Sequence, residues 1–198
     1  TTQFYIGSVS ATNPNIGLGG LQDNFTNQFQ GNVNNYWSLG HLGGDGSYNA
    51  IDPTDDNVQY GSYQYLNVFK SYDQGQSFSQ NIINNPASAF GNNVAAFLAP
   101  FVVAPSNTNV IYAGSQELSK STDQGGSFSV IGNSINFDPD GNFILALAVS
   151  HQNEDTLYIA TAPDFGPMKV YRTGDGGTTF TQINGTLPNR FHRRMAVN

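Results

Sequence analysis

Three aspartates recur at nearly equal intervals in almost identical surroundings, and paired carboxylates can perform general acid and base chemistry. They are Asp73, Asp123 and Asp175, in the octets SYDQGQSF at 71–78, STDQGGSF at 121–128 and TGDGGTTF at 173–180. Whether these carboxylates react with a substrate or only shape the chain depends on the elements that position them.

The residues around each octet predict a β-hairpin with the octet as its turn. Alternating runs lead in at 67–71, 117–121 and 169–173, and SFSQ, SFSV or TFTQ follows as the returning strand. In such a turn the aspartate accepts backbone hydrogen bonds, the glycine supplies a positive φ, the hydroxyl bonds locally and the phenylalanine anchors the returning strand. Folding therefore accounts for every fixed position, and we predict structural roles for Ser71, Asp73, Gly75, Phe78, Ser121, Asp123, Gly125, Phe128, Thr173, Asp175, Gly177 and Phe180.

A second strand–turn–strand element lies upstream of each octet, at 50–64, 102–116 and 148–162, with a further copy at 8–22. About four short strands in a repeat of about 50 residues is the content of a propeller blade. We predict one all-β domain over 1–198, with units at 1–49, 50–101, 102–147 and 148–198, incomplete at both ends. The first unit has no octet, and Asp23 is the nearest counterpart of the octet aspartate.

On these octets and the segments before them, the sequence resembles the Asp-box (BNR) repeat β-propellers. The segments GLQDNF at 20–25 and GGDGSYNAIDP at 43–53 also look like parts of secreted bacterial propellers. The resemblance implies a partial β-propeller of three to four four-stranded antiparallel blades, secreted or at a bacterial cell surface. It also implies that further blades, or other copies, cover the open edges. The family includes sialidases, xyloglucan-type glycoside hydrolases and sortilin-like receptors, so it implies a fold more than a function.

Composition excludes several classes of partner. The net charge of -7 and the lack of a long basic run argue against nucleic acid. The chain has no cysteine and no apolar stretch long enough to cross a membrane. The histidines at 41, 151 and 192 show no metal-binding spacing, and no cofactor is predicted.

Enzymatic interpretations need groups that the sequence supplies only in part. A sialidase needs three converging arginines and a tyrosine nucleophile, and three of the four arginines are crowded into NRFHRR at 189–194. A xyloglucanase-like site needs two facing carboxylates, and Asp45 or Asp164 could be one of them. Neither has an identifiable partner.

Two other groups are candidates for binding. Asp138, Asp140 and Asn142 partly mimic a calcium loop, although an ordinary hairpin turn is favoured. Tyr36, Trp37, Tyr63 and Tyr65 are aromatics among polar residues that could stack on sugar rings, although sheet packing explains them equally well.

Together these patterns favour a noncatalytic scaffold or recognition module that binds a glycan or a protein. One alternative is a glycoside hydrolase, xyloglucanase-like rather than sialidase-like, with part of its site outside this fragment. The other is a structural subunit that assembles with itself.

Overall fold

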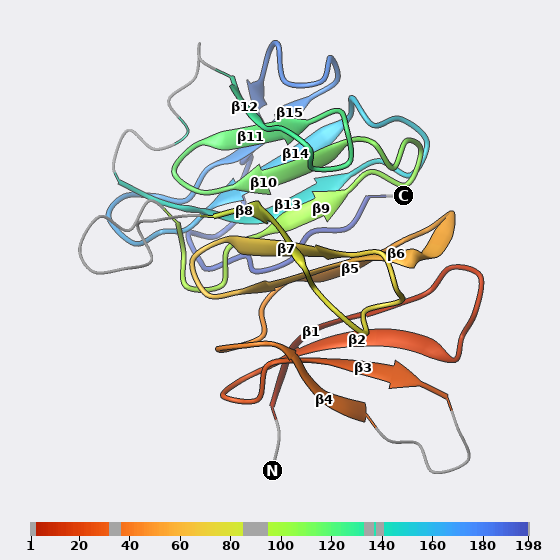
Figure 1. Cartoon of the computed structure of the whole chain (residues 1–198). Coiled ribbons are helices and arrows are strands. Elements are labelled where there is room, and N and C mark those ends of the chain that lie inside the picture. Colours follow the sequence, from red (N-terminus) through yellow and green to blue (C-terminus); the bar gives the residue numbers. More distant parts are fainter. Residues whose placement is uncertain (1–2, 32–36, 85–94, 133–136, 138–140, 198) are drawn as a thin grey trace. The chain divides into compact units, whose positions relative to one another are not determined.

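The computed structural model describes residues 3–31, 37–84, 95–132, 137 and 141–197, and within them every regular element is a β-strand (Figure 1). The strands form four antiparallel four-stranded sheets, each paired in chain order, which we call blades 1 to 4. This confirms the predicted all-β fold. The chain divides into two compact units, Thr1–Ser88 with blades 1 and 2, and Ala89–Asn198 with blades 3 and 4.

The strand bounds follow the predicted alternation of short strands and turns. Blade 1 holds β1 (Phe4–Val9), β2 (Ile16–Leu21), β3 (Thr26–Gln30) and β4 (Trp37–Leu42). Blade 2 holds β5 (Asn49–Asp52), β6 (Asp55–Tyr63), β7 (Asn67–Ser71) and β8 (Gln80–Ile83). Blade 3 holds β9 (Phe101–Val103), β10 (Ile111–Gly114), β11 (Leu118–Ser121) and β12 (Ser129–Ile131). Blade 4 holds β13 (Ile144–Val149), β14 (Leu157–Thr161), β15 (Val170–Thr173) and β16 (Thr181–Gln182).

Each blade has two ends with different turns, because a meander reverses direction at every strand. The first and third turns lie at one end, and the third turn of blades 2 to 4 is the octet, so we call this the octet end. The second turn and the segment that enters the blade lie at the other end, which we call the connector end. Asp45, Tyr65 and Asp164 all fall at connector ends.

Each unit has its own core between its two blades. In the N-terminal unit Ile16, Leu18 and Leu42 of blade 1 pack with Ile51 and Phe78 of blade 2. In the C-terminal unit the core gathers residues from both blades, together with the Phe137 ring, which meets the Tyr171 and Phe180 rings edge-on at 5.3 and 4.8 Å. Its fully buried members include Tyr112, Leu118, Ile144, Leu157 and Ile159.

A tyrosine and a cation face each other across the middle strands of three blades. The register pairs Tyr60 with Lys70, Tyr112 with Lys120, and Tyr158 with Arg172. The cations lie 5.6, 5.4 and 5.9 Å from the respective ring centroids, which is cation–π distance. Blade 1 has Leu18 opposite Gln28 at the corresponding register position.

The assignment of Asp23 as the counterpart of the octet aspartates was wrong. In blades 3 and 4 the residue after the octet aspartate donates its backbone N–H to the first turn of the blade, as Gln124 does to the Asn109 carbonyl. In blade 1 this bond is made by Gly31, to the Asn15 carbonyl, whereas Asp23 lies in the second turn at the connector end. A shared residue type suggested the match, but only the strand register could place it.

Candidate functional site

The three octets fold into the same hydrogen-bonded turn. Ser121 Oγ donates to Asp123 Oδ1 at 2.8 Å and accepts the backbone N–H groups of Asp123 and Gly125 at 3.3 and 2.9 Å. The Asp123 carboxylate also accepts the backbone N–H and the hydroxyl of Ser127 at 2.9 and 2.8 Å. The same bonds recur at 71–77 and 173–179. The turn glycines Gly75, Gly125 and Gly177 have φ of 79°, 88° and 96°, a region that favours glycine.

This geometry favours a structural role for the octet carboxylates over that of a general acid. The Ser127 backbone N–H, followed by the Ser121 and Ser127 hydroxyls, lowers the pKa of Asp123 to about 2. For Asp175 the Thr179 hydroxyl is the largest cause of a lowered pKa, and for Asp73 it is the Ser77 backbone N–H. Carboxylates that stay ionised and hold their own turn would make poor proton donors.

The lowered pKa values predict how stability depends on pH. A carboxyl whose pKa is depressed by folding stabilises the protein above its unfolded pKa of about 3.9, and that stability is lost as pH falls through the folded pKa. We therefore expect the octet contribution to the melting temperature to be constant above about pH 5 and to decline between about pH 4 and pH 2.

Thermal unfolding followed by circular dichroism at several pH values between 7 and 2 would measure this decline. The double variant Asp123→Asn with Asp175→Asn should melt lower at neutral pH and show a shallower decline below about pH 4. The matched control is Asp164→Asn, which removes an exposed aspartate outside the octets and should keep the full slope. An unchanged slope in the double variant would contradict the assignment.

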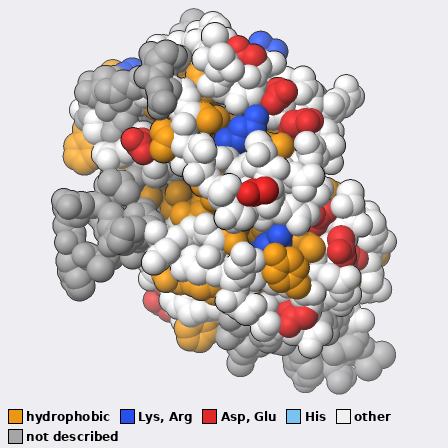
Figure 2. Space-filling model, turned by 45° about the horizontal axis from the view of Figure 1, so that its top comes forward, with side chains coloured by type: hydrophobic (Ala, Val, Ile, Leu, Met, Phe, Trp, Pro, Cys, Tyr) orange, Lys and Arg blue, Asp and Glu red, His pale blue; other side chains and the backbone are white. Residues whose placement is uncertain are grey.

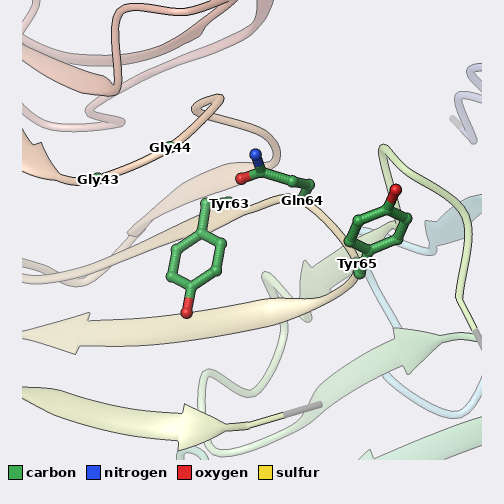
Figure 3. Close-up of a pocket in the computed structure, with 5 residues that line it drawn as sticks. All are labelled: Gly43, Gly44, Tyr63, Gln64 and Tyr65. Carbon is green, nitrogen blue, oxygen red and sulfur yellow. The ribbon is translucent and has the colours of Figure 1, made fainter. Parts of the chain in front are cut away.

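A pocket opens instead at the connector end of the N-terminal unit. It is a cavity of about 520 Å³ lined by Gly43, Gly44, Tyr63, Gln64 and Tyr65. Figure 3 shows the two tyrosine rings on either side of Gln64, whose amide is turned toward the Gly43–Gly44 segment. The three side chains between 63 and 65 are half-buried, so each has a surface that a ligand can reach.

The segment 43–46, which enters blade 2, is fixed to both neighbouring turns. The Asp45 backbone N–H donates to Gln64 Oε1 at 3.2 Å, and the Asp45 carboxylate accepts the Asp23 backbone N–H at 2.9 Å. The Tyr5 hydroxyl adds a long bond of 3.4 Å to the same carboxylate. A side chain on Gly44, which has φ of 73°, would clash with Gln64 Oε1. Asp45 therefore lies beside the pocket and also fixes the position of the Gly43–Gly44 segment that lines it.

The turn that carries the tyrosines is itself constrained. Tyr65 and Leu66 adopt φ of 62° and 63°, a left-handed conformation that is costly for residues other than glycine. Asn67 Nδ2 donates to the Gln64 carbonyl at 2.8 Å, and the Tyr63 ring lies 5.7 Å from the Phe69 ring. The pocket side chains are thus preorganised, because packing and hydrogen bonds fix the strained backbone beneath them.

The other predicted site residues are not gathered at this pocket. Asp164 is exposed in the second turn of blade 4, in the C-terminal unit. Asn142 is buried, and its side-chain oxygen accepts the Phe165 and Gly166 backbone N–H groups at 2.8 and 3.3 Å, which makes it a loop anchor. Tyr36, Asp138 and Asp140 lie outside the described residues, as does the side chain of Trp37.

Clusters of charged side chains are sparse over the described parts of the molecule. No three acidic or histidine side chains among the described residues come close enough together to hold a metal. No described segment forms a helix with the length and apolar character needed to cross a bilayer. On the face drawn in Figure 2, neutral polar side chains and backbone make up most of the surface, with acidic groups scattered among them.

Comparison with solved structures identifies the fold. The chain superposes on an ancestral GH74 enzyme with a TM-score of 0.74 over 95% of this chain, at 20% sequence identity. The fold is that of a β-propeller segment. The GH74 xyloglucanase from Xanthomonas campestris gives a TM-score of 0.70 over 96% of the chain at 14% identity, and the Niastella koreensis GH74 enzyme gives 0.65 over 91% at 22%. The chain spans only 26–32% of the length of these three enzymes. It matches no protein-family profile and no curated protein sequence.

Sequence reasoning singled out two of the five described residues that line the pocket, Tyr63 and Tyr65. It missed Gln64, which lies between them, and the glycines of the opposite wall. The dipeptide Gly43–Gly44 is a turn signal that places a bend there, but nothing in the sequence shows that this bend faces Gln64.

Proposed function

We propose that this chain is part of an Asp-box β-propeller that recognises a neutral glycan at the Tyr63–Tyr65 pocket without cleaving it. The observation that carries the proposal is the joint presence of two half-buried tyrosine rings and an amide in one cavity of about 520 Å³. Aromatic faces cover the C–H surfaces of sugar rings, and amides satisfy the hydroxyl groups at their edges.

The hydrogen-bonding capacity of Gln64 supports a polar uncharged ligand. Its Oε1 is occupied by the Asp45 backbone N–H, while no other described residue bonds its Nε2 group, which can donate to a ligand hydroxyl. Among the described residues, the pocket lining carries no charged side chain, and Asp45 beside it is acidic. An acidic sugar would be repelled there, so a neutral sugar fits better than a sialic acid.

Binding of soluble neutral polysaccharides, measured by affinity electrophoresis and calorimetry, tests the proposal. We expect Tyr65→Asn to weaken binding at least about tenfold, because it removes one ring, while asparagine tolerates the positive φ better than most residues. The control is Tyr72→Asn, which removes an exposed tyrosine at the octet end and should bind as the parent does. Equal binding by both variants would refute the assignment.

A glycoside hydrolase is the second candidate, favoured by the Asp45 carboxylate beside the pocket and by the fold shared with GH74 enzymes. Both Asp45 oxygens already accept hydrogen bonds, one from the Asp23 backbone N–H and one from the Tyr5 hydroxyl of β1, and a glycosidase needs a second facing carboxylate. We therefore favour binding over cleavage. Release of reducing sugar in the same samples would reverse this preference.

The enzyme-like fold and neutral polar surface also support a secreted or cell-surface location.

A further inference from the structure

A tyrosine and a lysine of blade 3 both form hydrogen bonds with blade 4. Tyr112 is fully buried, and its hydroxyl donates to the Glu154 carbonyl in the first turn of blade 4 at 2.9 Å. Lys120 Nζ donates to Asp155 Oδ1 in the same turn at 3.2 Å and to the Gly176 carbonyl in the octet at 3.4 Å. The contact is thus a cation and a ring that meet the first turn and the octet of the next blade.

Blade 4 repeats this pair on its opposite face. Tyr158 and Arg172 stand opposite each other at the same register as Tyr112 and Lys120. Side chains alternate between the faces of a strand, and the neighbours Leu157 and Ile159 pack in the core with blade 3, so Tyr158 and Arg172 point away from blade 3. Tyr158 is only half-buried and Arg172 is exposed, with Arg172 Nε donating to the Tyr158 hydroxyl at 3.3 Å.

The first turn of blade 1 has the acceptors that such a pair requires. Asn15 and Asp155 occupy the same place in their blades, because each bonds its backbone N–H to the side chain two residues earlier. Each also accepts a backbone N–H from the third turn, from Gly31 in blade 1 and from Gly176 in blade 4. The Asn15 side-chain oxygen and the Gly31 carbonyl therefore stand where Asp155 Oδ1 and the Gly176 carbonyl bind Lys120.

The face of blade 1 that corresponds to the blade 3-facing side of blade 4 is exposed at Val9. Val9 pairs with Gly17 as Val149 pairs with Leu157, so Val9 and Val149 correspond. Val149 is 6% exposed in the core against blade 3, whereas Val9 is 67% exposed. Ser8 hydrogen-bonds Asn49 of blade 2, so its neighbour Val9 points away from blade 2.

The charges at the two ends of the chain are opposite. The N-terminal unit has six aspartates and one basic residue, Lys70, for a net charge of -5. Residues 169–197 have five of the seven basic residues of the chain and one aspartate, for a net charge of +4. Opposite potentials of this kind steer association and fix its polarity.

We propose that the chain associates head to tail with a second copy of itself, independently of the glycan pocket. The exposed Tyr158–Arg172 part of this blade 4 face docks on Val9 and the first turn of blade 1 in the next copy, while Met195 of the same chain covers the neighbouring Ala160 and Val170. Arg172 donates to the Asn15 side-chain oxygen and the Gly31 carbonyl of that copy, as Lys120 does to Asp155 and Gly176. The contact joins two different surfaces, so a dimer keeps one free face of each kind and can add further copies.

Sedimentation velocity of the purified chain over a range of concentrations tests this interface. We expect dimers and longer species at an ionic strength of about 0.02 M and their dissociation at about 0.5 M. Arg172→Glu and Val9→Asp change exposed side chains and should each give a monomer with an unchanged circular dichroism spectrum. Arg172→Lys keeps the charge and should still associate.

A mixture of the two defective variants is the decisive sample. Arg172→Glu keeps an intact blade 1 and Val9→Asp keeps an intact blade 4, so mixing them should restore dimers but nothing larger. Parent protein that stays monomeric at every concentration, or a mixture that stays monomeric while the parent associates, would overturn the proposal. Glycan binding by a monomeric parent would leave the function proposed above standing, so the two proposals can fail separately.

Discussion

Replacing Gly46 by alanine is expected to destabilise the N-terminal unit by about 3 kcal/mol or more. An added Cβ would lie 2.1 Å from the Phe25 carbonyl oxygen and 2.8 Å from the Thr26 backbone nitrogen. These are backbone atoms where β3 begins, so they cannot rotate away as a flexible side chain would. The strain falls on the segment that also places Asp45 and Gly44, so the Tyr63–Tyr65 pocket should be lost with the stability.

Urea denaturation of parent and variant, together with the binding measurement, would record both effects. The control is Gly43→Ala, three residues earlier in the same segment, where a Cβ would meet nothing within 4 Å. That variant should keep its stability within about 0.5 kcal/mol of the parent value. A Gly46→Ala protein as stable as Gly43→Ala would show that the close approach of these two segments is not required.

Replacing Ile159 by alanine is expected to lower the free energy of unfolding by about 3 to 4 kcal/mol. Ile159 is completely buried in the core between blades 3 and 4, so the change removes apolar contacts and leaves a cavity between two β-sheets. Rigid sheets can close little of that space. The expected loss comes from the core alone, because Ile159 belongs neither to an octet nor to the pocket.

Leu187→Ala removes the same type of side-chain volume from a residue that is 51% exposed, and it should cost less than about 1 kcal/mol. Chemical denaturation with circular dichroism compares the two variants directly. Similar losses in both would mean that the interface between blades 3 and 4 is not the centre of this unit's core.

Local patterns in the sequence predicted the repeating part of the fold, because each octet makes its defining hydrogen bonds within itself. Asp123 finds its partners Ser121 and Ser127 inside the same eight residues, so residue order alone contains the geometry. Alternating apolar residues likewise marked the strands around it.

The Tyr63–Tyr65 pocket was only partly predictable, because its walls come from segments about 20 residues apart. Tyr63 and Tyr65 attracted attention as aromatics in a polar stretch, but Gln64 gains its role only by meeting Asp45 and Gly44 across two turns. The tyrosine–cation pairs show the same limit. The sequence places Lys120 in the run that leads into the second octet. Its contacts with Tyr112 and Asp155, however, depend on strand register and on blade packing.

The self-contained bonding of the octets also bears on how the chain is made. Every bond within an octet turn joins residues no more than four apart, so its closure requires almost no search, and we expect it to precede the pairing of distant strands. Each third hairpin can form as soon as its returning strand leaves the ribosome, before the next blade is synthesised. The octets thus give blades 2 to 4 independent starting points for folding. Fewer strand edges then stay unpaired while the rest of the chain is being synthesised.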